Sequence, residues 1–289
     1  MKTVQTWFAR AQAEGFALGA FNVANLETFK AVIQAAVNQQ SPVLLESSDG
    51  ETAYVGADNL VDLVANARAE TGLPIFLNLD HSRDFRKVKI ALNAGYDLVH
   101  YDGSKESPAK NIETLRHLVR MAHARHILVE GELDYIIEGS EVRTITAEEG
   151  QEASQLSDPK TAQAFVEATG LDTLAVSIGN VHGLYATPKK LNLTLLEKIR
   201  NSVDCFLSLH GGSGISDDQI RQAIVIGRIA KINISSELRQ ALRQGLEQGL
   251  ASHPTEVAMY KITPEAIKAV QKIVETKMKL FGSSGKATE

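Results

Sequence analysis

The chain has 289 residues, 44% of them hydrophobic, which is enough to bury a sizeable core. Its formal net charge of −5 comes from interspersed acidic and basic residues without a basic stripe, which argues against nucleic acid as the main partner. No apolar stretch reaches the ~18 residues of a membrane span, and residues 1–15 lack the apolar core of a signal peptide. The lone cysteine, Cys205, excludes an intrachain disulfide. We therefore expect a cytoplasmic protein.

Short strand-like segments recur along the chain, and several are continuous apolar runs such as Val43-Leu44-Leu45. Continuous apolar runs are typical of strands in a parallel sheet that is covered on both faces. The expected strands are Gly19–Val23, Pro42–Ser47, Ile75–Asp80, Leu98–Asp102, Ile127–Glu132, Thr173–Gly179, Cys205–His210 and Ala230–Ile234.

Amphipathic, helix-like stretches separate these strands, and several carry residues that cap helices. The expected caps are Asn25 before residues 26–39, Ser157 before 160–168 with Gly170 after it, and Asp217 before a run that Gly227 closes. After the eighth strand–helix unit there remain a helix over about residues 264–281 and a small polar tail, 282–289, which we expect to be frayed.

Eight alternating strand–helix units without a composition break predict a (β/α)8 barrel of the TIM type, with an extra C-terminal helix, as one domain over residues 1–289. A doubly wound sheet is the alternative, which periodicity does not exclude. In either fold, polar residues at the carboxyl ends of the strands gather at one site.

Three of the eight histidines lie at such strand ends: His81, His182 and His210. Three imidazoles with an open fourth position form a catalytic zinc site, whereas a single histidine at a strand end is as often a loop cap. We interpret the other five as structural or solvated: His100, His117, His123, His126 and His253.

Asp80 directly precedes His81 and is a candidate general acid or base, because both residues can reach a pocket where the chain leaves the sheet. The alternative is that Asp80 only orients a metal ligand.

Two segments are candidate phosphate sites. Gly211, Gly212 and Ser213 follow His210 in a glycine-rich run before a helix, and backbone N–H groups in such a run can approach an anion, although the run alone is more often a flexible turn. Asn233, Ser235 and Ser236 lie at the exit of the last strand, and barrels recurrently bind phosphate between their seventh and eighth strands.

Taken together, these segments resemble the class II, metal-dependent ketose-bisphosphate aldolases, which include the fructose- and tagatose-bisphosphate enzymes. The matching motifs follow the family's order over nearly the whole chain: Gly19-Ala-Phe-Asn-Val, Leu79-Asp-His, Asp102-Gly-Ser, Glu130-Gly-Glu-Leu, Gly179-Asn-Val-His-Gly-Leu-Tyr, His210-Gly-Gly-Ser-Gly-Ile and Lys231-Ile-Asn-Ile. The resemblance implies a carbon–carbon lyase of carbohydrate metabolism that acts on a small sugar phosphate as a homodimer or homotetramer.

The resemblance also implies roles for individual residues. Zinc or a similar ion would bind His81, His182 and His210, and Asp80 would move the proton of the hydroxyl at the cleaved bond. A monovalent cation, Na⁺ or K⁺, would lie near the phosphate loops. The dihydroxyacetone-phosphate half would bind at Gly183, Gly211, Ser213, Asn233 and Ser236, with Ser48 as a less secure substrate contact and with Asp102 and Glu132 beside the metal or at an alternative metal position.

The metal would stabilise the enediolate that carbon–carbon cleavage leaves, a task that a lysine Schiff base performs in class I aldolases. Lys231, on the last strand, is the residue that a Schiff-base mechanism would use, but that mechanism leaves the three histidines unexplained.

The chain departs from the family in its mobile loop, where Ser140 aligns with the family's glutamate. Glu141, or else Glu138, is therefore the expected base for the carbon-bound proton of dihydroxyacetone phosphate.

Two basic residues of the family are also missing, because Ala186 replaces a lysine and Ala258 replaces the arginine that holds the distal phosphate. Either another base substitutes, with Lys189, Lys190 and Lys261 as candidates, or the far end of the substrate is not the usual phosphate.

Two other functions remain open from the sequence. A metal-dependent epimerase or hydrolase could use the same metal and phosphate sites without breaking a carbon–carbon bond. A non-catalytic paralogue that only binds sugar phosphates would typically lack Asp80 or one of the three histidines, and this chain retains them all.

Overall fold

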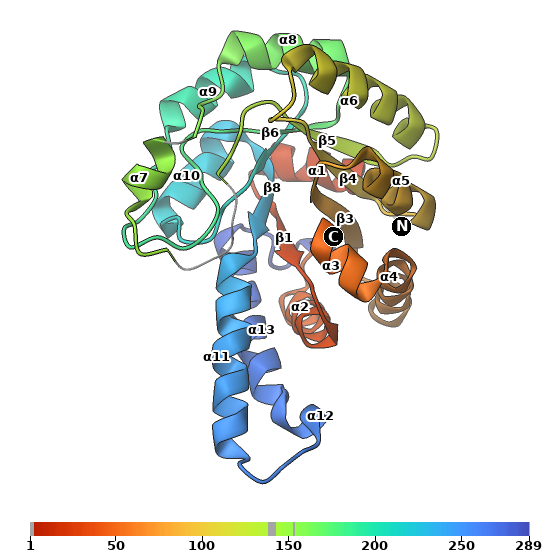
Figure 1. Cartoon of the computed structure of the whole chain (residues 1–289), viewed down its shortest axis with the longest axis vertical. Helices are drawn as coiled ribbons and strands as arrows, with labels where there is room; N and C mark the ends of the chain where they lie inside the picture. The colour runs from red at the N-terminus through yellow and green to blue at the C-terminus, as the bar shows by residue number, and fades with distance from the viewer. Residues whose placement is uncertain (1–2, 138–142, 153, 289) are drawn as a thin grey trace.

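Eight parallel strands close into a barrel in sequence order, because β1 pairs with both β2 and β8. Figure 1 shows β1 and β8 next to each other at the centre of the molecule. The computed structural model describes residues 3–137, 143–152 and 154–288. The closed order confirms the predicted barrel and excludes the doubly wound sheet. The strands are β1 Leu18–Asn22, β2 Val43–Ser48, β3 Ile75–Ser82, β4 Leu98–Asp102, β5 Leu128–Glu132, β6 Thr173–Ala175, β7 Phe206–Leu209 and β8 Ile229–Ile234.

The sixth strand is shorter than predicted, because the chain turns away directly after Ala175. Gly179 adopts a φ of 98°. The side chain of Asn180 accepts a hydrogen bond from Ile178 N at 2.8 Å and donates to the carbonyl of His210 at 3.1 Å. This turn therefore fastens the segment that carries His182 to the end of β7.

Helices follow the strands and surround the barrel (Figure 1). In α2, Asn25 forms the predicted cap as part of a capping box. In α8, the cap is Asp158 rather than Ser157, because Ser157 is hydrogen-bonded to the backbone of Ser177. The helices are α1 Val4–Glu14, α2 Leu26–Gln39, α3 Asp49–Val55, α4 Ala57–Thr71, α5 Phe85–Ala94, α6 Pro108–His123, α7 Ala147–Glu152, α8 Pro159–Thr169, α9 Leu193–Ser202, α10 Asp217–Gly227, α11 Ser236–Ser252, α12 Met259–Ile262 and α13 Pro264–Leu280.

The interior of the barrel changes from apolar to polar along its axis. At the amino ends of the strands, Leu18, Leu44 and Phe76 pack in one buried cluster with Trp7 and Phe8 of α1, so α1 closes that end of the barrel. Every second residue of a strand points inward, and toward the carboxyl ends these positions become Glu46, Asn78, His100 and Glu130 and then Asn22, Asp80, Asp102 and Glu132. The polar end of the interior is the candidate site.

The helices α11 and α13 pack side by side and project beyond the barrel, with α12 at the outer end of the projection (Figure 1). Residues 282–288 belong to the tail that we expected to be frayed, but they make specific contacts. Ser283 is fully buried and its hydroxyl lies 2.8 Å from that of Ser41, while Gly285 N donates to Gln39 O at 2.8 Å, so the tail packs against the end of α2. None of the helices within the described ranges is long and apolar enough to cross a membrane.

Candidate active site

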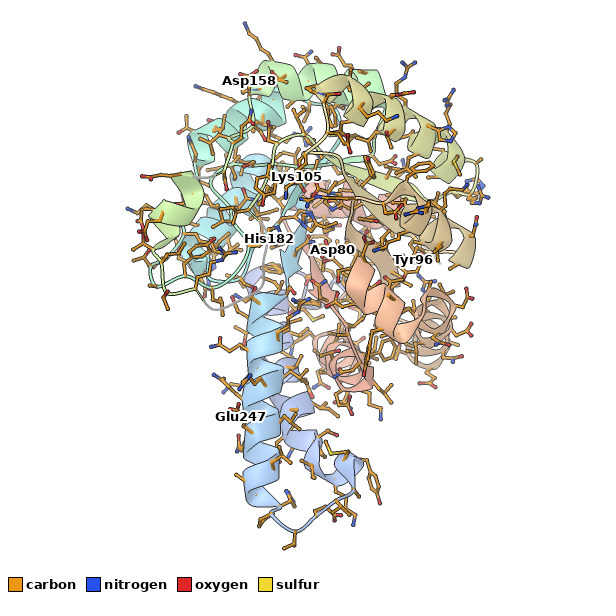
Figure 2. All side chains as sticks on the ribbon, in the orientation of Figure 1. Asp80, Tyr96, Lys105, Asp158, His182 and Glu247 are labelled. Atoms are coloured by element: carbon orange, nitrogen blue, oxygen red, sulfur yellow. The ribbon has the colours of Figure 1, made fainter. Side chains whose placement is uncertain are left out.

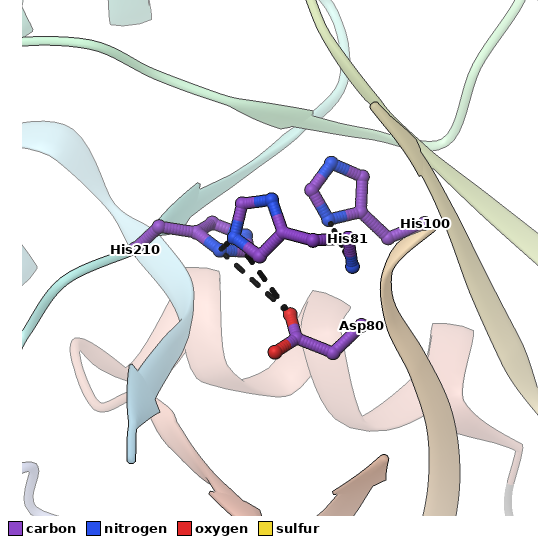
Figure 3. Close-up of side chains that lie close together, drawn as sticks. All are labelled: Asp80, His81, His100 and His210. Carbon is purple, nitrogen blue, oxygen red and sulfur yellow. Dashed lines mark hydrogen bonds and ion pairs between the residues drawn. The ribbon is translucent and has the colours of Figure 1, made fainter. Parts of the chain in front are cut away.

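Four histidines meet at the carboxyl ends of the strands. The ring of His81 lies 4.3 Å from that of His210, 4.8 Å from that of His182 and 4.6 Å from that of His100, measured between centroids. Figure 3 shows three of these rings around Asp80, and Figure 2 shows Asp80 and His182 near the centre of the barrel mouth. The structure therefore brings the rings of the three histidines predicted as ligands close together and adds His100. The group of candidate ligand atoms that lie within 4.8 Å of one another consists of Asp80, His81, His100 and His210, so His182 is near this group but not part of it.

Asp80 and His81 both face this site although they are adjacent in the chain. His81 has a φ of 48°, in the left-handed region that residues other than glycine rarely adopt, and the pairing of β3 with β4 shifts register between Leu79 and Ser82. The kink rotates one side chain relative to the other, so the alternation of an ordinary strand does not separate them.

Acidic side chains orient two of the rings. His210 donates from Nε2 to Glu130 Oε1 at 2.7 Å, which turns its Nδ1 toward His81 Nε2 at 2.6 Å. His81 Nδ1 lies 3.2 Å from Glu132 Oε2. A carboxylate behind a histidine fixes the ring and raises its basicity as a metal ligand.

His182 supplies the remaining nitrogen. Within the described ranges, its Nε2 is buried and has no hydrogen-bond partner. An unpaired buried nitrogen is costly unless something binds it. Its place beside His81 and His210 makes a bound metal ion the simplest partner.

His100 is the residue that sequence reasoning missed as part of the site. Its Nδ1 accepts a hydrogen bond from His81 N at 3.3 Å, and its Nε2 lies 3.5 Å from Glu132 Oε2. Nδ1 thus holds the kinked end of β3, whereas Nε2 is buried and, among the described residues, has no hydrogen-bond partner. The signal was present in the sequence, because His100 lies two residues before Asp102 on one strand and so shares its inward face.

The four histidines differ in their electrostatics, because burial lowers the pKa of His100, His182 and His210, with the charge of His81 acting in the same direction. Burial lowers the pKa of His81, but the charges of Asp80 and Glu132 outweigh burial and raise the pKa to about 10. The negative surroundings that retain a proton at His81 would also attract a divalent ion. The nitrogen set with neighbouring carboxylates fits such an ion chemically.

Asp102 and Glu132 form a second group with His81 in which the candidate ligand atoms lie within 4.8 Å of one another. Asp102 already accepts hydrogen bonds from Arg83 Nε at 2.9 Å and from Ser104 N at 3.0 Å. This pairing makes Asp102 better suited to orienting neighbours than to holding an ion of its own.

The carboxylate of Asp80 is held by amides from the first and last strands. Asn22 Nδ2 donates to Oδ2 and Asn233 Nδ2 donates to Oδ1, each at 3.1 Å. Burial raises the pKa of Asp80, but the nearby His81, His210 and Lys231 outweigh burial and hold the pKa below its usual range. Asp80 is therefore an ionised carboxylate that can accept a proton. Asn22 was not singled out from the sequence.

A small cavity opens beside Asp80 and His182. The residues that line it are Asn22, Asp80, His182, Gly183, Gly211, Ser213, Asn233, Ser235 and Ser236. The beginning of α11 lies at this cavity, and a helix N-terminus favours an anion. Apart from Gly212 and Ser48, the residues predicted to bind the phosphate half therefore gather around one cavity.

Gly212 and Ser48 do not line this cavity. The N–H of Gly212 donates to Asn233 O at 3.1 Å and so is not directed at an anion. Ser48 pairs with Asp80 in the register of β2 and β3, but its hydroxyl accepts a hydrogen bond from Glu51 N at 3.4 Å as the cap of α3. A direct substrate contact by Ser48 stays a prediction.

Lys231 lies below the site in a fully buried ionic group. Its Nζ is 2.6 Å from Glu130 Oε2 and 3.0 Å from Glu46 Oε1. Burial lowers the pKa of Lys231, but the two carboxylates outweigh burial and raise it above the usual range. A lysine held as ammonium cannot attack a carbonyl, which argues against a Schiff base here.

The three candidates for the distal base, Lys189, Lys190 and Lys261, do not line the cavity beside Asp80. Lys189 is buried and donates to the backbone of Gly211 and Ser213, while the exposed Lys190 lies 3.8 Å from Glu148. Lys261 is in α12, at the outer end of the projecting hairpin, and Ala258 is the N-cap of α12. The loop-base candidates Glu138 and Glu141, with Ser140, lie outside the described residues.

Comparison with known proteins agrees with this geometry. The family model described as "Fructose-bisphosphate aldolase class-II" matches residues 2–286. A curated fructose-bisphosphate aldolase of Geobacillus stearothermophilus is 36% identical over 95% of this chain and 94% of its own. The crystal structure of the YdjI aldolase of Escherichia coli K12 has a TM-score of 0.84 and 32% identity, covering 98% of each chain. A putative fructose-1,6-bisphosphate aldolase of Coccidioides immitis has a TM-score of 0.83 and 29% identity, covering 98% of this chain and 97% of its own.

Proposed function

The chain belongs to the class II fructose-bisphosphate aldolase family, a family of carbon–carbon lyases that act on sugar phosphates, and we propose that it is a zinc-dependent enzyme of this kind. It would reversibly cleave a ketose 1-phosphate or 1,6-bisphosphate to dihydroxyacetone phosphate and an aldehyde. The main support for this proposal is the position of His182. The unpaired Nε2 of His182 lies beside His81 and His210, at a cavity that is also lined by Asp80 and by serine and glycine residues.

His81, His182 and His210 would hold the ion, with Glu132 and Glu130 behind two of the rings. When bound there, a divalent ion supplies Lewis-acid polarisation of the substrate's carbonyl and hydroxyl oxygens. Tetrahedral nitrogen ligation with an open position is the usual arrangement of catalytic zinc, which is why zinc is the ion proposed.

Asp80 would take the proton from the hydroxyl group next to the bond that breaks. Asn22 and Asn233 would keep the two carboxylate oxygens of Asp80 oriented during this transfer, because each amide donates to one of them. Proton transfer by a positioned side chain is efficient when the group is held within hydrogen-bond reach of the reacting atom. The carbon-bound proton of dihydroxyacetone phosphate needs a second base, for which Glu141 is the predicted residue.

The phosphate of the substrate would lie in the cavity between the strand ends of β6, β7 and β8. Its proposed contacts are Gly183, Gly211, Ser213, Ser235 and Ser236, and Asn233 would contact the sugar half. Small residues let backbone and hydroxyl donors approach an anion closely, and the N-terminus of α11 adds a favourable dipole.

A panel of ketose phosphates tests both the reaction and its specificity. We expect triose phosphate release from a ketose 1-phosphate with a higher kcat/KM than from fructose 1,6-bisphosphate, because neither Ala186 nor Ala258 can pair with a distal phosphate. A missing charged contact typically costs 2–5 kcal/mol, so kcat/KM for fructose 1,6-bisphosphate should be roughly 30-fold or more below that of a relative that keeps the arginine. A coupled assay for triose phosphate measures both rates. Isomer formation without triose phosphate would instead support an epimerase.

We also propose that the chain is a homodimer or homotetramer, in which the projecting hairpin contributes to the contact. Val257 and Tyr260 near its outer end have exposed fractions of 89% and 76%. Neighbouring exposed apolar side chains on a protein surface often mark an interaction site. Replacing Val257 and Tyr260 by aspartate should lower the mass measured by light scattering, whereas a monomeric parent would contradict the proposal.

A further inference from the structure

Lys189 places an amino group inside the protein, beneath the loop that the proposed function assigns to phosphate. Its side chain is only 1% exposed. Its Nζ donates to Gly211 O at 2.9 Å and also to Ser213 O. The loop passes directly over the lysine, since a Cβ added to Gly214 would lie 4.0 Å from the Lys189 Cε.

The two carbonyl groups belong to peptide units that are fixed from both sides. Opposite the carbonyl of Gly211, the N–H of Gly212 donates to Asn233 O at 3.1 Å. Opposite the carbonyl of Ser213, the N–H of Gly214 donates to Glu237 Oε1 at 2.8 Å. The ammonium thus completes the set of contacts that determines where Gly211 and Ser213 lie at the cavity.

The same segment is tightly packed against its neighbour. Gly211 has a φ of 62°, and a Cβ there would lie 2.4 Å from the carbonyl oxygen of Val181. The loop at Gly211 and the segment that leads to His182 are therefore in close contact. A shift of the two carbonyl groups would therefore move the residues that line the cavity on both of its sides, Gly211 and His182.

Backbone carbonyl oxygens are also the ligands with which proteins bind potassium and sodium ions. The resemblance to the aldolase family led us to expect such an ion near the phosphate loops. The residues present do not fit it, because the carbonyl oxygens of Gly211 and Ser213 already accept hydrogen bonds from Lys189 Nζ.

We infer that the Lys189 ammonium is the built-in cation of this loop, so that the protein binds the substrate's phosphate without a free monovalent ion. The inference rests on the proposed function, in which the loop holds that phosphate. Lys189 is then a positioning residue, because it acts through the backbone of Gly211 and Ser213. Burial lowers the pKa of Lys189 to about 7, opposed by Glu237, and both the carbonyl acceptors and a bound phosphate favour the charged form.

The first test uses the unaltered protein. Initial rates of triose phosphate release and the affinity for dihydroxyacetone phosphate are measured in potassium, sodium and choline chloride at equal ionic strength. We expect the same values in all three salts. Activation by potassium or sodium over choline would overturn the inference.

The second test replaces the charge. Lys189→Met keeps the unbranched, apolar part of the side chain but removes the amino group, so that two buried carbonyl groups lose this donor. We expect KM and the dissociation constant of dihydroxyacetone phosphate to rise about 10-fold or more, with a smaller change in kcat. Added potassium or ammonium should partly restore both constants and raise the unfolding midpoint of this variant, while choline should not. Lys190→Met, the same change at the adjacent exposed residue, should behave like the parent.

Unchanged affinity in Lys189→Met without any dependence on potassium would overturn the inference. If that variant does not fold, the salt series on the parent decides alone. If the parent releases triose phosphate from no ketose phosphate, the proposed function fails separately, and the potassium dependence of the unfolding midpoint of Lys189→Met still decides the role of the lysine.

Discussion

A chelator is expected to abolish turnover, and added zinc or cobalt to restore it. The physical reason is the geometry around His81, whose Nε2 lies 2.6 Å from His210 Nδ1 while His182 Nε2 has no partner among the described residues. Imidazole nitrogens placed in this way suit a divalent ion, which would replace the hydrogen bond between His81 and His210, and without that ion the enediolate has no counter-charge. Metal analysis and the triose phosphate assay measure the two quantities together. Full turnover after verified metal removal would contradict the proposed chemistry.

The structure also predicts which histidines hold the ion. His182→Ala should lose the ion, because the substitution removes Nε2, which is a proposed ligand atom. His100→Ala should keep it with an affinity about 10–100-fold weaker, the usual effect of removing a group that only orients a ligand. Competition titration with a chelating dye measures both affinities. If His100→Ala releases the ion and His182→Ala retains it, the assignment of ligands is wrong.

Replacing Asp80 by alanine is expected to lower kcat by roughly 10²–10⁴-fold, the usual contribution of a positioned acid or base. The metal content should not change, because Asp80 Oδ1 lies 3.9 Å from both His81 Nε2 and His210 Nδ1 and its closer contacts are the amides of Asn22 and Asn233. Steady-state kinetics and metal analysis on one preparation measure the effect.

Asp84→Ala is a suitable control, since it also removes a carboxylate close to the end of β3. The side chain of Asp84 caps α5 and does not line the cavity. The substitution should lower the unfolding midpoint, because α5 loses its cap, and leave kcat unchanged. Loss of the ion in Asp80→Ala would mean that Asp80 has a structural role in the metal site.

Much of the fold followed from the sequence because its signals are local. The helix over residues 26–39 and the strand Leu98–Asp102 have the predicted bounds, since apolar spacing and a cap residue define them without help from the rest of the chain. The three ligand candidates also came from local position, because each follows a strand and a barrel gathers strand ends.

Other features depend on contacts between distant segments, which spacing does not report. The left-handed φ of His81 and the buried position of Lys189 have no local signal. Ser157 and Asp158 are adjacent candidates for one cap, and the backbone of Ser177 decides between them. The tail beyond Gly282 is polar, yet Ser283 is buried through its contact with Ser41.

The pairing of β1 with β8 also bears on the order in which the site can be assembled during synthesis. The strands that precede His81, His182 and His210 are all made before β8, so the histidine cluster needs only the first seven strands. Asp80, in contrast, receives one amide from Asn22 on β1 and the other from Asn233 on β8, and the cavity beside it is lined by Ser235 and Ser236. Only closure of the barrel between β1 and β8 therefore brings both amides to the carboxylate of Asp80 and completes the site.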